Sequence, residues 1–256
     1  MRASGNPRRR GLPKTFGRDR TGAKTLSIAE NLTRVRERIA EAERKAGRKS
    51  GSVTLMAVSK FHPAESVLEA MAAGQNLFGE NRVQEATEKF AQVGASRPGA
   101  ELHLIGSLQR NKVAKIITVA SCVQSVDRAE LLTEIEKQAS ARDLSLRVLF
   151  EFHTGEESKS GYPDRDALFR SIDLLAGMPH VRCSGLMTMA PFTADSARVR
   201  ASFSMLKSLQ DECQRRYPKL DFSILSMGMS GDFELAIAEG STLVRVGTAI
   251  FGERVQ

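Results

Sequence analysis

The sequence has 256 residues, 41% of them hydrophobic, and carries a formal net charge of +8 at pH 7. This length suits one large domain or two small ones, and no run approaches the roughly 18 apolar residues of a membrane-spanning helix. The three cysteines form no CxxC pair and the four histidines show no helical pairing, so we expect a cytoplasmic protein with no disulfide framework, metal site or membrane span.

Nearly all of the excess positive charge lies in residues 1–26. This segment holds eight basic residues and one acidic residue, which leaves a net charge of only +1 for the rest of the sequence. It contains several glycines and prolines and almost no apolar side chains, so it cannot bury enough surface to fold. We therefore predict a disordered basic tail at 1–26 and a folded domain at 27–256. An unstructured extension is favoured over a nucleic-acid-binding arm.

The folded part is predicted to begin with an amphipathic helix that ends at Gly47. Ser27 and Glu30 have the spacing of a capping box, and Leu32 and Val35 begin an apolar face at helical spacing. Strand patterns then occupy Val53–Ser59, Asn76–Gly79, Leu102–Ile105, Ser121–Val126, Leu146–Phe152, Cys183–Met189, Phe222–Met227 and Leu243–Val246. Helical patterns separate them, at residues 62–74, 84–90, 113–117, 131–135, 168–177, 199–209 and 233–238.

Eight strands that alternate with helices predict an α/β protein with a single (β/α)8 (TIM) barrel and an extra N-terminal helix. The folded length is close to the roughly 250 residues typical of this barrel. The alternative is a doubly wound open sheet, which is disfavoured because no GxGxxG motif follows the first strand.

In such a barrel, functional side chains lie at the C-terminal ends of the strands. The first predicted strand leads directly into Lys60. Partial desolvation there would lower the pKa of the amine, and a neutral amine can form a Schiff base with an aldehyde. Most lysines are solvated surface charges, and Lys112 and Lys159 are the alternatives. They are disfavoured because the first lies in a helical pattern and the second in a loop.

Two turns of small residues follow the seventh and eighth strands, where this barrel usually binds phosphate. They are Met227–Gly231 and Gly247-Thr248. Their glycines permit close backbone approach, and the start of the following helix offers amide groups to an anion. Either turn alone could be no more than a tight connection. Together they favour a phosphate site.

Arg245 interrupts the apolar run of the eighth strand, and its alternation with Leu243 and Gly247 predicts that it points into the barrel. A buried arginine requires partners. One alternative is an internal ion pair, for example with Glu80. The other is donation to the pyridine nitrogen of a cofactor, which would keep that nitrogen unprotonated and make the ring a weaker electron sink.

Seven motifs in register carry a family resemblance. They are AVSK at 57–60, FGENRVQE at 78–85, HLIGSLQRNK at 103–112, EESKSG at 156–161, GLMTM at 185–189, SMGMSGD at 226–232 and RVGTAIFG at 245–252. On these residues the sequence resembles the pyridoxal-phosphate homeostasis protein family, also called the proline synthase co-transcribed family, over about residues 27–254.

The resemblance implies a fold like the N-terminal barrel of alanine racemase, with pyridoxal 5'-phosphate (PLP) bound to Lys60 as an internal aldimine. It places Asn81 near the ring and Arg245 at the pyridine nitrogen. The residues that it places around the phosphate are Ser226, Gly228, Met229, Ser230, Gly247 and Thr248. The implied role is control of the intracellular supply of PLP (vitamin B6), with no firm catalytic activity. PLP-dependent apoenzymes are candidate partners, and a monomer is expected.

Two segments depart from the family pattern. Residues 150–154 replace a more amide-rich end of the fifth strand, and the basic tail has no counterpart among the motifs.

A PLP-dependent amino-acid racemase on the same barrel is the alternative function. A racemase of this type needs a tyrosine opposite the lysine. The only tyrosines are Tyr162 and Tyr217, and neither is at a predicted strand end, although Tyr162 adjoins the loop that contains Lys159. A third hypothesis, nucleic-acid binding through the tail, is disfavoured because the folded part is nearly neutral.

Overall fold

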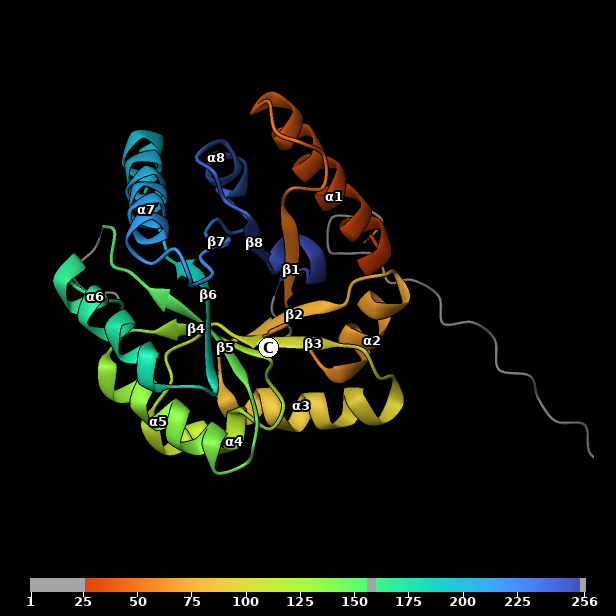
Figure 1. Cartoon of the computed structure of the whole chain (residues 1–256). Helices are drawn as coiled ribbons and strands as arrows, with labels where there is room; N and C mark the ends of the chain where they lie inside the picture. Colours follow the sequence, from red (N-terminus) through yellow and green to blue (C-terminus); the bar gives the residue numbers. More distant parts are fainter. Residues whose placement is uncertain (1–25, 156–159, 254–256) are drawn as a thin grey trace, which may run out of the picture.

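The computed structural model describes residues 26–155 and 160–253. Eight parallel strands close into a barrel in chain order, as the sequence predicts (Figure 1). The strands are β1 (Thr54–Val58), β2 (Leu77–Glu80), β3 (Glu101–Leu104), β4 (Cys122–Val126), β5 (Leu146–Glu151), β6 (Val181–Met187), β7 (Ile224–Ser226) and β8 (Leu243–Val246). β8 pairs with β1 through four residue pairs, which closes the barrel.

Helices form a ring around the strands in chain order (Figure 1). They are α2 (Ala64–Ala72), α3 (Val83–Ser96), α4 (Val113–Ile116), α5 (Ala129–Ser140), α6 (Arg165–Asp173), α7 (Ser196–Arg216), α8 (Phe233–Ala238) and α9 (Thr248–Phe251). Two 3-10 turns, η1 (Arg110–Lys112) and η2 (Leu174–Gly177), adjoin α4 and α6. η1 and α9 are the elements that the sequence patterns do not predict, whereas η2 lies within the helical pattern at 168–177.

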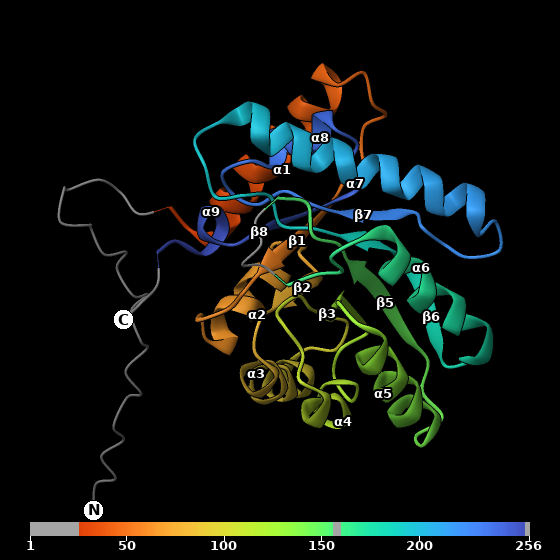
Figure 2. The same cartoon turned by 90° about the vertical axis from the view of Figure 1, so that its left-hand side faces the viewer.

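The first helix, α1 (Ile28–Lys45), precedes β1 and belongs to the outer ring. It begins with the predicted capping box, in which Ser27 Oγ accepts from the Glu30 amide and the Glu30 carboxylate accepts from the Ser27 amide. α1 packs against α8 on one side and α2 on the other. Figure 2 shows α1 beside α8. It thus fills the position in the ring between the helix after β7 and the helix after β1.

The sixth and seventh strands differ most from their predicted ranges, because β6 begins two residues early and β7 is short. Gly185 lies at an irregularity in the β5–β6 register, with φ +147°. A Cβ atom there would lie 1.8 Å from the carbonyl oxygen of Ile224. The close approach of β6 to β7 therefore requires glycine.

The main apolar core lies between the sheet and the helices, and a smaller cluster of Cys122, Leu149 and Met187 lies apart from it. Their strand neighbours Val123 and Val148 belong to the main core. Because side chains alternate along a strand, the smaller cluster faces the inside of the barrel. Among the described residues, no helix is both long and apolar enough to cross a membrane. Residues 1–25 of the predicted tail lie outside the described part.

Candidate functional site

A cavity of about 290 Å³ lies at the C-terminal ends of the strands. Seven of the nine predicted site residues line it: Lys60, Asn81, Met229, Ser230, Arg245, Gly247 and Thr248. Ser226 and Gly228, the other two, are not among the lining residues. Sequence patterns do not predict most of the other lining side chains, which include Val58, Phe61, His62, Ile105, Met187 and Met189. Most of these are apolar and are indistinguishable by type from ordinary core residues.

A larger groove of about 780 Å³ lies mainly between α1 and α8 and is lined by surface residues such as Arg38, Glu41 and Glu234. Arg38 and Glu234 already pair across it. No strand end opens into this groove, so we place the functional site at the barrel mouth.

Lys60 lies two residues after the end of β1 and is half-buried. The next residue, Phe61, has φ +66°, a left-handed conformation that is strained for a bulky side chain. Such a conformation persists only where surrounding contacts impose it, so the turn that carries Lys60 must be held by its neighbours.

The contacts that hold this turn come from Lys89, Glu85 and Glu80, which we call the Lys89 anchor. Lys89 Nζ, on α3, donates to the Ser59 carbonyl at 2.7 Å, and Glu85 accepts from the Phe61 amide at 2.6 Å. Lys89 also pairs with Glu85 at 2.9 Å and with Glu80 at 2.7 Å. The peptide groups on both sides of Lys60 are therefore bound to one ion-paired cluster.

Glu80, at the end of β2, is fully buried and also accepts from the Ser59 hydroxyl at 2.7 Å. Burial raises the pKa of this carboxyl, even though Lys89 lowers it. Glu80 pairs with Lys89, and Arg245 donates to other acceptors, so the alternative of an Arg245–Glu80 ion pair is wrong.

Arg245 lies inside the barrel and is almost completely buried. Its Nη1 donates to Ser226 Oγ and its Nη2 to the Thr188 carbonyl, both at 2.8 Å. Burial lowers the pKa of the guanidinium to about 10, and the charges of Glu151 and Asp232 partly offset this effect. The group therefore stays protonated at neutral pH, with its plane set by two acceptors.

Asn81 presents an unsatisfied group to the cavity. Within the described part of the chain, its buried Oδ1 has no hydrogen-bond partner. A buried acceptor without a donor is costly, so this oxygen suits a hydroxyl or N–H group supplied by a ligand.

The turn after β7 has the geometry of an anion cradle. Gly228 has φ +93°, and a Cβ atom there would lie 2.6 Å from Ala236 Cβ and 2.9 Å from Phe233 Cα. The Gly228 carbonyl accepts from the Arg245 amide, which joins the turn to β8. The amides of Ser230 and Gly231 donate to no acceptor among the described residues. Ser230 and Gly231 both line the cavity, so their amides are candidates to bind an anion there.

The described tyrosines lie outside this cavity. Tyr162 is buried against Phe150, and Tyr217, just after α7, donates to Asp173 at 2.8 Å. Of the alternative lysines, Lys112 ends η1 away from the cavity lining, and Lys159 lies outside the described residues.

Comparison with known proteins identifies the family. The family "Alanine racemase, N-terminal domain" matches residues 31–255. The "Pyridoxal phosphate homeostasis protein" of Vibrio cholerae is 40% identical over 231 residues, which cover 89% of this chain and 97% of that protein. The chain belongs to the pyridoxal phosphate homeostasis protein family. The member from Pseudomonas aeruginosa is 42% identical over 229 residues, which cover 89% of this chain and 96% of that one.

Solved structures extend the comparison with this family. PipY of Synechococcus elongatus, solved with PLP bound, is 37% identical, with a TM-score of 0.79 over 88% of this chain and all of that chain. An alanine racemase of Clostridium difficile shares the fold, with a TM-score of 0.70 at 12% identity. The match covers 90% of this chain and only 57% of the racemase.

Proposed function

We propose that this family member binds PLP in the barrel-mouth cavity through a covalent bond between Lys60 Nζ and the aldehyde carbon. The observation that carries the proposal is that an amine, a buried guanidinium and a turn with available amides line one cavity. The relative PipY has PLP bound, and the relatives that match over nearly their whole length are PLP homeostasis proteins. When bound, PLP supplies an aldehyde that a lysine amine attacks reversibly.

The described residues fit the parts of PLP. Ser230, Gly231 and Thr248 offer amides and hydroxyls to the phosphate. The unsatisfied Asn81 Oδ1 suits the ring hydroxyl. Arg245 donates to the pyridine nitrogen, and because it keeps its own proton at neutral pH, that nitrogen stays unprotonated.

We further propose that the protein holds and releases PLP and does not turn over amino acids. An unprotonated ring nitrogen withdraws electrons weakly, so the site provides little stabilisation for a carbanion. Among the described residues that line the cavity there is no tyrosine to act as the second base of a racemase. It stays a prediction that the protein is a monomer and that PLP-dependent apoenzymes receive PLP from it.

The test is to trap the bond. The purified chain is mixed with PLP, its visible spectrum is recorded, and the adduct is reduced with borohydride and mapped by mass spectrometry. We expect one equivalent of label on the peptide that contains Lys60. Label on Lys112 or Lys159, or no reducible label, would contradict the proposal.

Gly228→Ala is expected to weaken PLP binding by about tenfold or more, because the turn must move to relieve contacts with Ala236 and Phe233 and its amides then miss the phosphate. Pyridoxal, which has no phosphate, should bind the variant and the wild type equally. Gly74→Ala is the matched control. Gly74 also has a positive φ, +80°, but a Cβ atom added there would have no other atom within 4 Å. Equal losses for PLP and pyridoxal would count against the phosphate assignment.

A further inference from the structure

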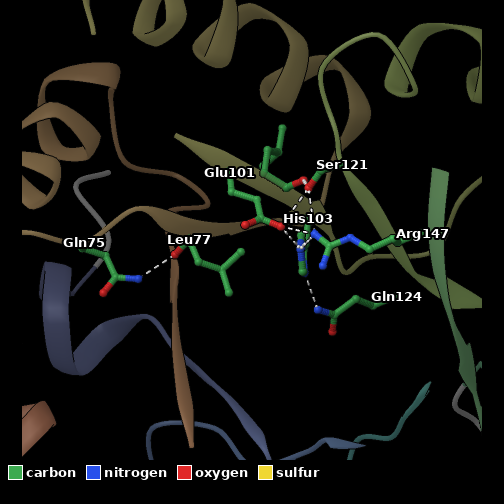
Figure 3. Close-up of polar contacts among 8 residues, drawn as sticks. Gln75, Leu77, Glu101, His103, Ser121, Gln124 and Arg147 are labelled. Carbon is green, nitrogen blue, oxygen red and sulfur yellow. Dashed lines mark hydrogen bonds and ion pairs between the residues drawn. The ribbon is translucent and has the colours of Figure 1, made fainter. Parts of the chain in front are cut away.

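A line of hydrogen bonds runs through the barrel interior from Arg245, and we call it the interior relay. Arg245 Nη1 donates to Ser226 Oγ at 2.8 Å, and Ser226 Oγ donates to Gln124 Oε1 at 2.7 Å. Gln124 Nε2 lies 2.8 Å from His103 Nδ1, and His103 Nε2 lies 3.0 Å from Glu101 Oε1. Figure 3 shows the His103 ring between Gln124 and Glu101. The relay joins the cavity to the first residue of β3, at the opposite end of the barrel.

The far end of the relay is fixed by an ion pair. Arg147, on β5, contacts the Glu101 carboxylate, and its Nη2 lies 3.2 Å from His103 Nε2 (Figure 3). Ser121 Oγ also donates to Glu101 at 3.1 Å. Hydrogen bonding from His103, together with the charge of Arg147, lowers the pKa of Glu101 to about 2, against the opposing effect of burial. The relay therefore ends on an ionised carboxylate at neutral pH.

Stability alone does not account for the relay. Ser226, Gln124 and His103 are essentially inaccessible to solvent. Barrel interiors of this kind are usually filled by branched apolar side chains. A buried polar network often does little more than offset its own desolvation, and apolar replacements of similar volume are often as stable. The polar interior is therefore better explained by a role at the cavity.

The chemistry of the groups gives the relay one direction. A guanidinium only donates, so Ser226 Oγ accepts from Arg245 and turns its own hydrogen toward Gln124 Oε1. The Gln124 amide then donates from Nε2 to His103 Nδ1. His103 consequently carries its proton on Nε2 and donates to Glu101. Each member has a partner in this arrangement, and His103 is neutral.

The reverse direction leaves groups unsatisfied. If Arg147 donated to His103 Nε2, the ring would donate from Nδ1 and the Gln124 amide would have to flip. Ser226 would then receive N–H groups from both Gln124 and Arg245, and its hydroxyl would lose its acceptor in the relay. The bond from His103 to Glu101 would also be lost. The first arrangement is therefore preferred.

We propose that Gln124 and His103 are positioning residues that hold Ser226 as an acceptor and so fix the Arg245 guanidinium where it meets the pyridine nitrogen of PLP. This inference rests on the proposed function. Arg245 has two acceptors, and Thr188 supplies the other through its backbone. The Ser226 hydroxyl is thus the side-chain contact that the relay can set, and residues at the far end of the barrel act on the cofactor through it.

The first test uses the protein without PLP. ¹⁵N NMR of the histidine rings at pH 7 should show His103 protonated at Nε2 and unprotonated at Nδ1. In Arg245→Met, Ser226 is no longer forced to accept from a guanidinium, so the Gln124 amide can flip and the second tautomer should appear. Identical His103 shifts in wild type and Arg245→Met would overturn the coupling.

The second test measures PLP affinity and the visible absorption maximum in Gln124→Leu. We expect affinity to fall about tenfold, because a hydrogen bond to a charged group loses its support, and we expect the maximum to shift as the charge beside the ring moves. Gln75→Leu is the matched control. Gln75 is also buried and its Nε2 donates twice, to the carbonyls of Leu55 and Leu77. It should lower the melting temperature comparably and leave the affinity and the absorption maximum unchanged.

The double variant Gln124→Leu/His103→Leu separates positioning from stability. It removes the orphaned Nδ1 acceptor along with its donor, so the melting temperature should recover toward wild type while PLP affinity stays low. If affinity recovered together with stability, or if Gln124→Leu bound PLP as tightly as wild type with the same spectrum, the inference would be overturned. A wild-type protein that gave no visible band would instead contradict the proposed function, and the NMR test of the coupling would still stand.

Discussion

Lys60→Ala is expected to bind PLP without a visible band from a covalent adduct and with affinity reduced on the order of a hundredfold, or about 3 kcal/mol of binding free energy. The physical reason is that Lys60 carries the only amine that lines the cavity in the part of the chain the structure describes. The phosphate and ring contacts remain, so weak non-covalent binding should persist. Absorbance titration and fluorescence quenching with added PLP measure the two effects separately.

Lys112→Ala is the control for the Lys60 variant, because Lys112 is an exposed lysine outside the cavity lining. It should keep the wild-type spectrum. Lys60 lies outside β1 and is half-buried, so its replacement should change the unfolding free energy by about 1 kcal/mol or less. A reducible adduct that survived in Lys60→Ala would move the covalent bond to another lysine, with Lys159 the first to be examined.

The position of the cavity could be predicted from the sequence because it follows from strand periodicity. In an eight-stranded barrel the C-terminal ends of the strands meet at one mouth. The positions of Lys60 and Arg245 along their strands are therefore enough to predict that both lie there. The boundaries of β6 could not be predicted in the same way. β6 pairs with β7 through a close approach of Gly185 to Ile224, 39 residues further along the chain, and local patterns do not contain this pairing.

The supporting contacts could not be predicted, because they join residues that local patterns treat separately. Lys89 and Glu85 are four residues apart on α3, a spacing typical of a solvated surface pair, yet both hold the turn of Lys60. Ser226 and Gln124 meet across 102 positions of sequence. One signal was available: Glu80 falls at the end of an apolar strand, and a buried carboxylate requires a partner.

Lys89→Met is expected to destabilise the protein by about 3–5 kcal/mol at neutral pH, since it leaves a buried carboxylate without its counter-charge. The Lys89 side chain is 6% exposed and that of Glu80 is 0% exposed, so water cannot replace the lost contacts. The Ser59 carbonyl also loses its donor. Urea unfolding measures the loss. Attachment of PLP should also slow, because the turn that carries Lys60 is released.

Two variants isolate the cause of this loss. Lys45→Met removes a lysine of a surface pair with Glu41, whose Nζ–Oε1 distance is 3.4 Å and whose lysine side chain is 71% exposed. Its effect should stay within about 0.5 kcal/mol. Lys89→Met/Glu80→Gln removes both buried charges and keeps an acceptor for the Ser59 hydroxyl. It should recover most of the stability, whereas a double variant as unstable as Lys89→Met would show that packing, and not charge, causes the loss.

The unfolding free energy of Lys89→Met should depend on pH, because Glu80 can take up a proton. Burial already raises the pKa of Glu80 against the influence of Lys89, and removal of the ammonium raises that pKa further. A carboxyl whose folded pKa exceeds its unfolded value binds more protons in the folded state, so its contribution to stability is present at low pH and is lost as pH rises through the folded pKa. The stability difference between Lys89→Met and wild type should therefore be smaller at about pH 5 than at about pH 8, and the double variant should show little such dependence. A difference that did not change with pH would mean that the Glu80 carboxyl does not take up a proton when Lys89 is removed, which would contradict the unpaired buried charge as the cause of the lost stability.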